Sequence, residues 1–433
     1  MGNCLNKMSG KVRDESFSID LPMSNIVLTR YLYLKDEVKL ALLVSLLNKS
    51  DDAIFWAYEL YYSGFKMELY DYIWTIYYDF FATLNPSFEQ YLNKTLKCDN
   101  EPEDKLVSTI VQDLLIRPFN TDIFFLRTIC NLFEVECSFI TAKSVTKIAF
   151  SSTIMYEQLT KWIDTKDFKS IAQYILNIVI LDTSDKMLYS IYSVAIDIFT
   201  NIYNLKVVKT KLIKEFCLAQ DRILNNSNIR GELLTNMIYR KRVVLLTKIM
   251  TLFSLKEKLV KGKNFYIVVE PESIIQYETI DATSSNIKHY KVLDVARICG
   301  IDDLKHLSLF RLERDTIKGE DKQLKDMYFG NWLYHAAFSP VWFNRIKQYR
   351  GYVDYIKMTV EFVDEDVMQM FYLKYGYEPD EQSQHTTDKC LKINDGINWK
   401  TFYEKFKGNG LFLIDEDEIE ELNNDKIRYP VYF

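Results

Sequence analysis

Residues 50–64 read SDDAIFWAYELYYSG, and this stretch shows the pattern that decides the fold. Ser50 suits the N-cap of a helix, because its hydroxyl can accept a hydrogen bond from a free backbone N–H. Asp51 and Asp52 then place negative charge in the first turn, where the helix dipole favours it. Apolar and aromatic residues follow at helical spacing, and Gly64 supplies the usual residue after the last turn. The stretch predicts an amphipathic helix with its aromatic side chains in the core.

The same alternation of helix and polar turn continues along the chain. No glycine lies between Gly64 and Gly231, and no proline lies between Pro118 and Pro271. Because these residues mark turns, their scarcity predicts packed helices joined by short connections. There is no repeat of fixed period, so an irregular helical array and a helical bundle both fit. Beyond the first stretch, helices are expected over residues 35–48, 66–84, 87 onward (with a Ser87–Gln90 capping box), 102–117, 121–134, 142–163, 166–181, 184–205, 206–225 and 231–260.

The character of the sequence changes after Lys263. Two β-prone runs, residues 265–269 and 274–280, flank Glu270-Pro271-Glu272 and predict a hairpin. A further strand is expected over residues 358–362. Helices are expected over residues 294–315, 323–338, 340–349 and 364–375, the third with Ser339 as N-cap and Pro340 at the first helical position.

These patterns predict a mainly α fold with a smaller mixed α+β domain at the C-terminal end. We expect a flexible N-terminal tail over residues 1–30, an all-α helical domain over residues 31–262 and a mixed α/β domain over residues 263–433. The composition is that of a globular protein, with 48% hydrophobic and 26% charged residues. Enough aromatic and aliphatic side chains are therefore present to fill more than one core.

Composition also limits the functional classes. A net charge of −6 gives no overall case for nucleic-acid binding. Seven cysteines, an odd number without a secretory signal, favour a reducing compartment over a disulfide framework. No apolar run is long enough to predict a membrane span.

The motifs of several enzyme classes are missing. The chain has no Gly-x-x-x-x-Gly-Lys loop, no Gly-x-Gly-x-x-Gly loop and no Gly-x-Ser-x-Gly elbow. None of the four histidines stands in a zinc-binding pattern, and His335 lies in an apolar run that favours a buried core position. We therefore predict no catalytic residue, no metal and no cofactor. A site assembled from scattered helical residues stays open.

The N-terminus, Met1-Gly2-Asn3-Cys4, resembles a lipidation signal. Gly2 is a candidate for myristoylation and Cys4 for palmitoylation, and two acyl chains together give a stable membrane anchor. Asn6 departs from the pattern, which has Ser or Thr at that position, and Met23 offers a second start. The alternative interpretation is an inert tail.

Positive charge is concentrated between Lys206 and Lys263, where 14 lysines and arginines face 4 acidic residues. Such a stretch can contact nucleic-acid phosphates or another anionic surface. The candidate contact residues are Arg240, Lys241, Arg242 and Lys248. The alternative is a solvated helix face that acids elsewhere in the fold neutralise.

Aromatic and acidic residues alternate in a turn segment after the helix expected over residues 364–375. Tyr375, Tyr377, Glu378 and Asp380 mix chemical groups that suit contact with a protein partner. A packed domain corner explains the same residues equally well. The acidic runs 364–366 and 415–421 lack the glycine and spacing of a calcium loop, which favours solvated helix faces.

Three segments together resemble uncharacterised proteins of large nucleocytoplasmic DNA viruses. They are residues 53–65, residues 339–346 (SPVWFNRI) and residues 375–382 (YGYEPDEQ). The resemblance implies a viral protein in a host cytoplasm or a virion, where host lipidation of Gly2 is available, and it carries no known activity or site residue. Residues 53–64 are also similar to a helix of clamp-loader collar domains, but the ATPase module of those proteins is missing.

Taken together, these observations predict a non-enzymatic interaction or structural protein that binds a protein partner. Association with a virion, or with a membrane through the acylated N-terminus, is the expected setting. The alternative is a nucleic-acid-associated accessory factor that uses the basic helices of residues 206–263.

Overall fold

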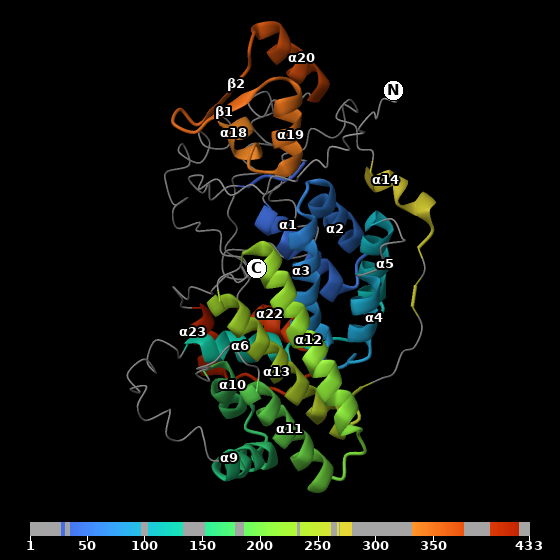
Figure 1. The fold of residues 1–433 in the computed structure, drawn as a ribbon, viewed down its shortest axis with the longest axis vertical. Coiled ribbons are helices and arrows are strands. Elements are labelled where there is room, and N and C mark those ends of the chain that lie inside the picture. Colours follow the sequence, from blue (N-terminus) through green and yellow to red (C-terminus); the bar gives the residue numbers. More distant parts are fainter. Residues whose placement is uncertain are drawn as a thin grey trace, which may run out of the picture.

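The computed structural model describes residues 27–30, 35–96, 103–132, 152–177, 186–231, 234–260, 266–267, 269–278, 331–375 and 399–423. The predicted mainly α fold is confirmed, because helices dominate these residues and their strands form one two-stranded sheet (Figure 1). Within the described ranges, no helix combines the length and apolar character that crossing a bilayer requires.

A large helical body is formed by elements from both ends of the chain (Figure 1). Its elements are α1 (Lys35–Asn48), α2 (Asp52–Tyr62), α3 (Lys66–Ile76), the π-helical turn η1 (Tyr77–Phe81), α4 (Phe88–Thr95), α5 (Glu103–Leu115), α6 (Asp122–Leu132), α9 (Ser152–Thr165), α10 (Phe168–Leu176), α11 (Lys186–Asn201), α12 (Lys209–Arg230), α13 (Leu234–Lys256), the 3₁₀ turn η2 (Pro271–Ser273), α14 (Ile275–Glu278), α22 (Trp399–Phe406) and α23 (Glu416–Asn423).

Helix α13 lies at the centre of this body. It packs against α6, α10, α11 and α12, and every residue from Val244 to Ser254 is buried. A helix that is covered on all sides does not need a polar face, which explains its weak amphipathic pattern. The other helices take their positions around it.

Most helices expected on the described residues are present, and the helix expected over residues 294–315 lies outside them. The N-cap of α2 is Asp51 and not the expected Ser50, and two further differences concern later elements. The helix expected over residues 66–84 changes from α to π geometry at Tyr77. The expected capping box at Ser87 does not form, because Ser87 makes no side-chain cap bond and Gln90 donates instead to Glu215 on α12, at 2.5 Å. A long-range partner therefore replaces the local one.

The hairpin expected over residues 265–280 is wrong. Residues 271–278 form the turn η2 and the short helix α14, which packs on α2. Ile274 and Tyr277 are three residues apart, so a helical turn brings both toward α2, where the ring of Tyr277 stacks on that of Tyr58 with centroids 5.0 Å apart. Packing on α2 therefore decides the conformation of a run that is β-prone by composition.

A second core belongs to the small module, which we define as residues 331–375. It contains α18 (Trp332–Ala336), α19 (Pro340–Gln348), β1 (Tyr352–Asp354), β2 (Thr359–Glu361) and α20 (Glu365–Tyr375). Ser339 caps α19 as predicted, and the expected strand pairs antiparallel with β1, Val353 opposite Val360. Trp342 is fully buried at the centre of this core and packs edge-on against Trp332.

The small module rests on the end of α2 (Figure 1). The indole N–H of Trp342 donates to the carbonyl of Thr29 at 3.0 Å, and the N–H of Val341 donates to the carbonyl of Ser63 at 3.3 Å. Pro340 lies directly against Gly64, so a side chain at residue 64 has no room. Gly64 therefore both follows the last turn of α2 and contacts the small module through Pro340.

The described residues after Lys263 are divided between two cores, whereas a single domain was predicted over residues 263–433. Phe402 and Tyr403 of α22 pack against aromatic rings of α6 in the large body. The carboxylate of Asp122, at the start of α6, accepts hydrogen bonds from the N–H groups of Leu411 at 2.9 Å and Phe412 at 3.2 Å. The chain thus leaves the helical body, forms the small module and returns.

Replacing Gly64 with alanine is expected to separate the small module from α2. A Cβ atom at Gly64 would lie 2.5 Å from the Cβ of Pro340, and its φ of +93° also disfavours an L side chain. We expect a loss of about 3 kcal/mol in the free energy of unfolding, together with a changed near-ultraviolet circular dichroism signal from Trp332 and Trp342.

Gly231→Ala is the matched control, because its φ is +67° but a Cβ there meets nothing within 4 Å. It should lose only roughly 1 kcal/mol and keep the tryptophan signal. Equal effects of the two substitutions would show that backbone strain, and not contact with Pro340, determines the outcome.

Asp122 is expected to make stability depend on pH. Burial raises the pKa of this carboxyl from 3.8 to about 6, although the N–H groups of Leu411 and Phe412 lower it. The folded chain then binds more protons than the unfolded chain between pH 3.8 and 6, so this group's contribution to stability falls as pH rises through that window. Relative to wild type, Asp122→Asn should gain about 2 kcal/mol in unfolding free energy between pH 4 and pH 7, measured by urea denaturation. A constant difference at both pH values would contradict this assignment.

Candidate functional site

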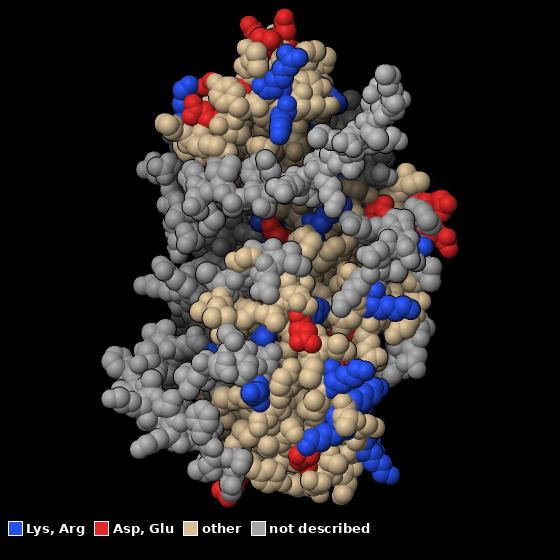
Figure 2. All heavy atoms as spheres, viewed as in Figure 1, with Lys and Arg blue, Asp and Glu red and all other residues tan. Residues whose placement is uncertain are grey.

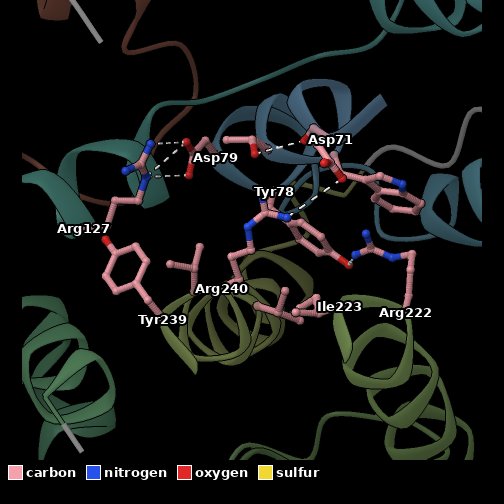
Figure 3. Close-up of a pocket in the computed structure, with 12 residues that line it drawn as sticks. Asp71, Tyr78, Asp79, Arg127, Arg222, Ile223, Tyr239 and Arg240 are labelled. Atoms are coloured by element: carbon pink, nitrogen blue, oxygen red, sulfur yellow. Dashed lines mark hydrogen bonds and ion pairs between the residues drawn. The ribbon is translucent and has the colours of Figure 1, made fainter. Parts of the chain in front are cut away.

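The described residues enclose a charged hollow between α3, η1, α6, α12 and α13 (Figure 3). Its volume is about 60 Å³, and three arginine side chains from three different helices reach it. We call it the arginine pocket. Its lining residues are Asp71, Trp74, Thr75, Tyr78, Asp79, Arg127, Arg222, Ile223, Tyr239, Arg240, Val243 and Val244.

Arg127 and Asp79 form a bidentate ion pair at one side of the pocket. Nε of Arg127 lies 2.9 and 3.1 Å from the two carboxylate oxygens, and Nη2 lies 2.6 Å from Oδ2. Burial lowers the pKa of Arg127, but the Asp79 carboxylate and Tyr239 raise it above its ordinary value. Burial also raises the pKa of Asp79, and Arg127 offsets this only in part. This pair joins η1 to α6. Because Nε and Nη2 of Arg127 already donate to Asp79, few of its N–H groups remain for another anion.

Arg222 lies at the opposite side of the pocket and has a different environment. Its guanidinium lies 3.6 Å from the ring centroid of Trp74, and Nη2 donates to the Tyr78 hydroxyl at 2.9 Å. Nε is buried and has no hydrogen-bond partner. Among the residues that the structure describes, no carboxylate forms an ion pair with this guanidinium.

Tyr78 connects Arg222 to a buried acid. Its hydroxyl accepts from Arg222 and donates to Oε1 of Glu89 at 2.6 Å, while the other oxygen of Glu89 contacts the ammonium of Lys248. Burial raises the pKa of Tyr78 well above its ordinary value, so the phenol stays protonated at neutral pH. The hydrogen bonds therefore run in one direction, from Arg222 to Tyr78 and from Tyr78 to Glu89.

The basic residues predicted to contact phosphate point mostly into the protein. Lys241 and Lys248 are buried, and Lys248 contacts Glu89. Nη1 of Arg242 donates to the carbonyl of Leu176 at 2.6 Å. Arg240 lines the arginine pocket, with Nη1 3.9 Å from a carboxylate oxygen of Asp71. These residues do not form the surface stripe that the sequence suggested.

The exposed part of the basic stretch lies elsewhere. Lys206, Lys211 and Lys214 are exposed, and basic side chains gather near the turn between α11 and α12 (Figure 2). Lys209 pairs with Asp197 at 2.6 Å and Lys211 lies 3.8 Å from Glu215, so part of this charge is offset locally.

Tyr375, predicted as a partner contact, is 92% buried. Its ring packs on Trp342 and Phe371 in the core of the small module, and the guanidinium of Arg345 lies 4.8 Å from its centroid. The structure therefore supports the alternative interpretation for Tyr375, in which it packs in a corner of the domain. The other predicted partner contacts (Tyr377, Glu378 and Asp380) and the predicted lipidation residues (Gly2 and Cys4) lie outside the described residues.

Large apolar side chains are exposed on the outer side of the same module. Met370 and Leu373 are three residues apart on α20 and face away from the buried Phe371 and Tyr375. We define the apolar surface as five exposed apolar side chains of the small module: Ile356 and Met358 in the hairpin turn, Val363 between β2 and α20, and Met370 and Leu373 on α20. This surface could not be predicted from the sequence, because helical periodicity does not show which face of a helix is buried.

His335 is buried, as the apolar run around it predicted. Burial lowers its pKa from 6.5 to about 4, so the imidazole is neutral at pH 7. Across the described ranges, no three His, Cys, Asp or Glu side chains are arranged to hold a metal ion.

The chain matches no protein-family model, no curated protein and no solved structure. The resemblance to proteins of large DNA viruses therefore stays a prediction. Any proposal about function rests on the arginine pocket and the apolar surface.

Breaking the Arg127–Asp79 pair is expected to be costly. Asp79→Leu and Arg127→Leu should each lose about 3–5 kcal/mol in unfolding free energy, because each leaves one buried charge without its partner. The double variant should lose less than the sum of the two, with a coupling of at least about 2 kcal/mol measured by urea denaturation.

The control cycle uses the exposed pair of Lys166 and Glu257, whose charged atoms lie 2.9 Å apart. Its coupling should be below about 1 kcal/mol. Similar couplings for the two pairs would show that burial of Arg127 and Asp79 does not matter.

Proposed function

We propose that this protein is a non-enzymatic interaction protein that binds a protein partner through the apolar surface of the small module. The observation that carries the proposal is the exposure of Ile356 and Leu373, 95% and 85%, beside a well-packed core. Single exposed apolar residues are ordinary, so the proposal rests on several large ones being presented by one small, well-packed unit.

The apolar surface has rigid support. On α20, Phe371 packs against Trp342, Tyr349 and Phe362, so the backbone that presents Met370 and Leu373 is fixed before any partner arrives. A preorganised surface loses less conformational entropy on binding than a flexible one. Leucine and methionine side chains can then fill apolar pockets of a partner.

Charge around the surface indicates the kind of partner. Asp364, Glu365 and Asp366 are exposed where α20 begins, and acidic side chains gather at that end of the molecule (Figure 2). The nearby Lys357 is already paired with Glu361 at 2.6 Å. A partner that presents apolar side chains flanked by lysine or arginine fits this arrangement best.

The helical body suits a supporting role. It anchors the small module through Thr29, Ser63 and Gly64 and holds it away from the central helix α13 (Figure 1). The missing catalytic motifs favour the same interpretation. Membrane attachment through Gly2 and Cys4 would place the module near a membrane, but the binding surface does not require it.

Leu373→Glu should abolish partner binding without unfolding the protein. The substitution places a charge in the apolar surface, where burial against a partner would be costly. We expect one protein to be captured from the native cell by wild type and lost with Leu373→Glu. The purified captured protein should then bind the variant at least about tenfold more weakly in calorimetry, with the melting temperature unchanged.

Leu413→Glu is the matched control, because Leu413 is 72% exposed but lies on the helical body. It should bind like wild type. Sedimentation velocity tests whether the partner is a second copy of this chain. Equal binding by both variants, or no self-association and no captured protein that depends on Leu373, would contradict the proposal.

A further inference from the structure

Arg222 has a property that the apolar surface does not explain. The other two arginines of the arginine pocket face carboxylates, Arg127 at Asp79 and Arg240 at Asp71. Arg222 has the Trp74 ring and the neutral Tyr78 hydroxyl instead. The three guanidinium groups and two carboxylates of the lining therefore leave one positive charge without a counter-ion in the pocket.

Two arginines of the pocket are candidates to bind an anion. Arg222 comes from α12 and Arg240 from the adjacent α13. The Arg240 side chain points toward Asp71, and that of Arg222 lies on the other side of the Tyr78 ring, beside the Tyr78 hydroxyl (Figure 3). Both are half-buried and so remain reachable from solvent. Nη1 of Arg240 lies 3.9 Å from a carboxylate oxygen of Asp71. The buried Nε of Arg222 is a donor that still lacks an acceptor.

We propose that the arginine pocket binds a phosphate group, with Arg222 as the principal ligand and Arg240 as the second. Guanidinium groups match the geometry of phosphate oxygens and donate two hydrogen bonds at once. The Trp74 ring fixes the plane of Arg222, which prepares its edge for the anion.

The size of the pocket limits the ligand. A volume of about 60 Å³ is small beside the roughly 300–1,000 Å³ of ordinary ligand pockets. We therefore expect only the phosphate group of a ligand to enter it. The anion is then either free phosphate or the head of a phosphate ester whose remainder lies outside the pocket. Asp71 competes for Arg240 and keeps the affinity moderate.

The test is isothermal titration calorimetry of the full chain with inorganic phosphate, and with O-phosphoserine as the ester, at fixed ionic strength in sodium chloride. Wild type should bind at least one of them with a stoichiometry of one. Arg222→Gln should weaken binding about ten- to hundredfold, and Arg240→Gln should weaken it less. Arg222→Lys keeps the positive charge but loses the planar guanidinium that can donate two parallel hydrogen bonds, so it should bind with intermediate affinity.

Lys214→Gln is the matched control. It removes one positive charge from the same helix, at an exposed residue outside the pocket, and should bind like wild type. If Arg222→Gln does not fold, Arg222→Lys and Arg240→Gln carry the comparison. Stronger binding of phosphoserine than of phosphate would identify an ester as the ligand, and the reverse would identify the free ion. Binding of neither, or equal losses in Arg222→Gln and Lys214→Gln, would overturn the proposal.

Discussion

The structure depends on the burial of α13, a helix that is both apolar and basic. Its residues from Val244 to Ser254 have no exposed side, and Lys248 lies within that run. An ammonium without a partner in such a position would cost several kcal/mol. Glu89 of α4 removes this cost by contacting Lys248, and the Tyr78 hydroxyl satisfies the other oxygen of Glu89. The helices around α13 are therefore placed by charge as well as by apolar packing.

The same requirement explains the form of the arginine pocket. Packing a basic pair of helices, α12 and α13, against η1 and α3 brings arginines to a place where few acids are available. Asp79 and Asp71 offset two of them, and Arg222 is left with an aromatic ring and a phenol. Such a position is tolerable because Trp74 and Tyr78 interact favourably with a cation, and it is also suited to receiving an anion.

The small module separates binding from support. Its core is anchored to the helical body by Trp342 and by close contact between Pro340 and Gly64, while α20 faces outward. Aromatic packing around Phe371 holds that helix in place, so the exposed Leu373 belongs to a rigid surface. The two proposed sites lie on different units and have different chemistry, one apolar with an acidic edge and one cationic. Each proposal can therefore be tested without disturbing the other site.

The class of fold and many helix ends could be predicted from the sequence alone. Capping residues such as Ser339, and residues that follow the last turn of a helix such as Gly64, act within one turn. Their effect can therefore be predicted from a short stretch of sequence. Tertiary contacts were needed to make residues 275–278 helical, to pair Lys248 inside the protein and to bury Tyr375. Each of these depends on a partner distant in the chain, 159 residues away for Lys248 and Glu89. Periodicity shows that a helix has two faces. The neighbouring elements decide which face is buried and which charged side chain is left without an ion-pair partner.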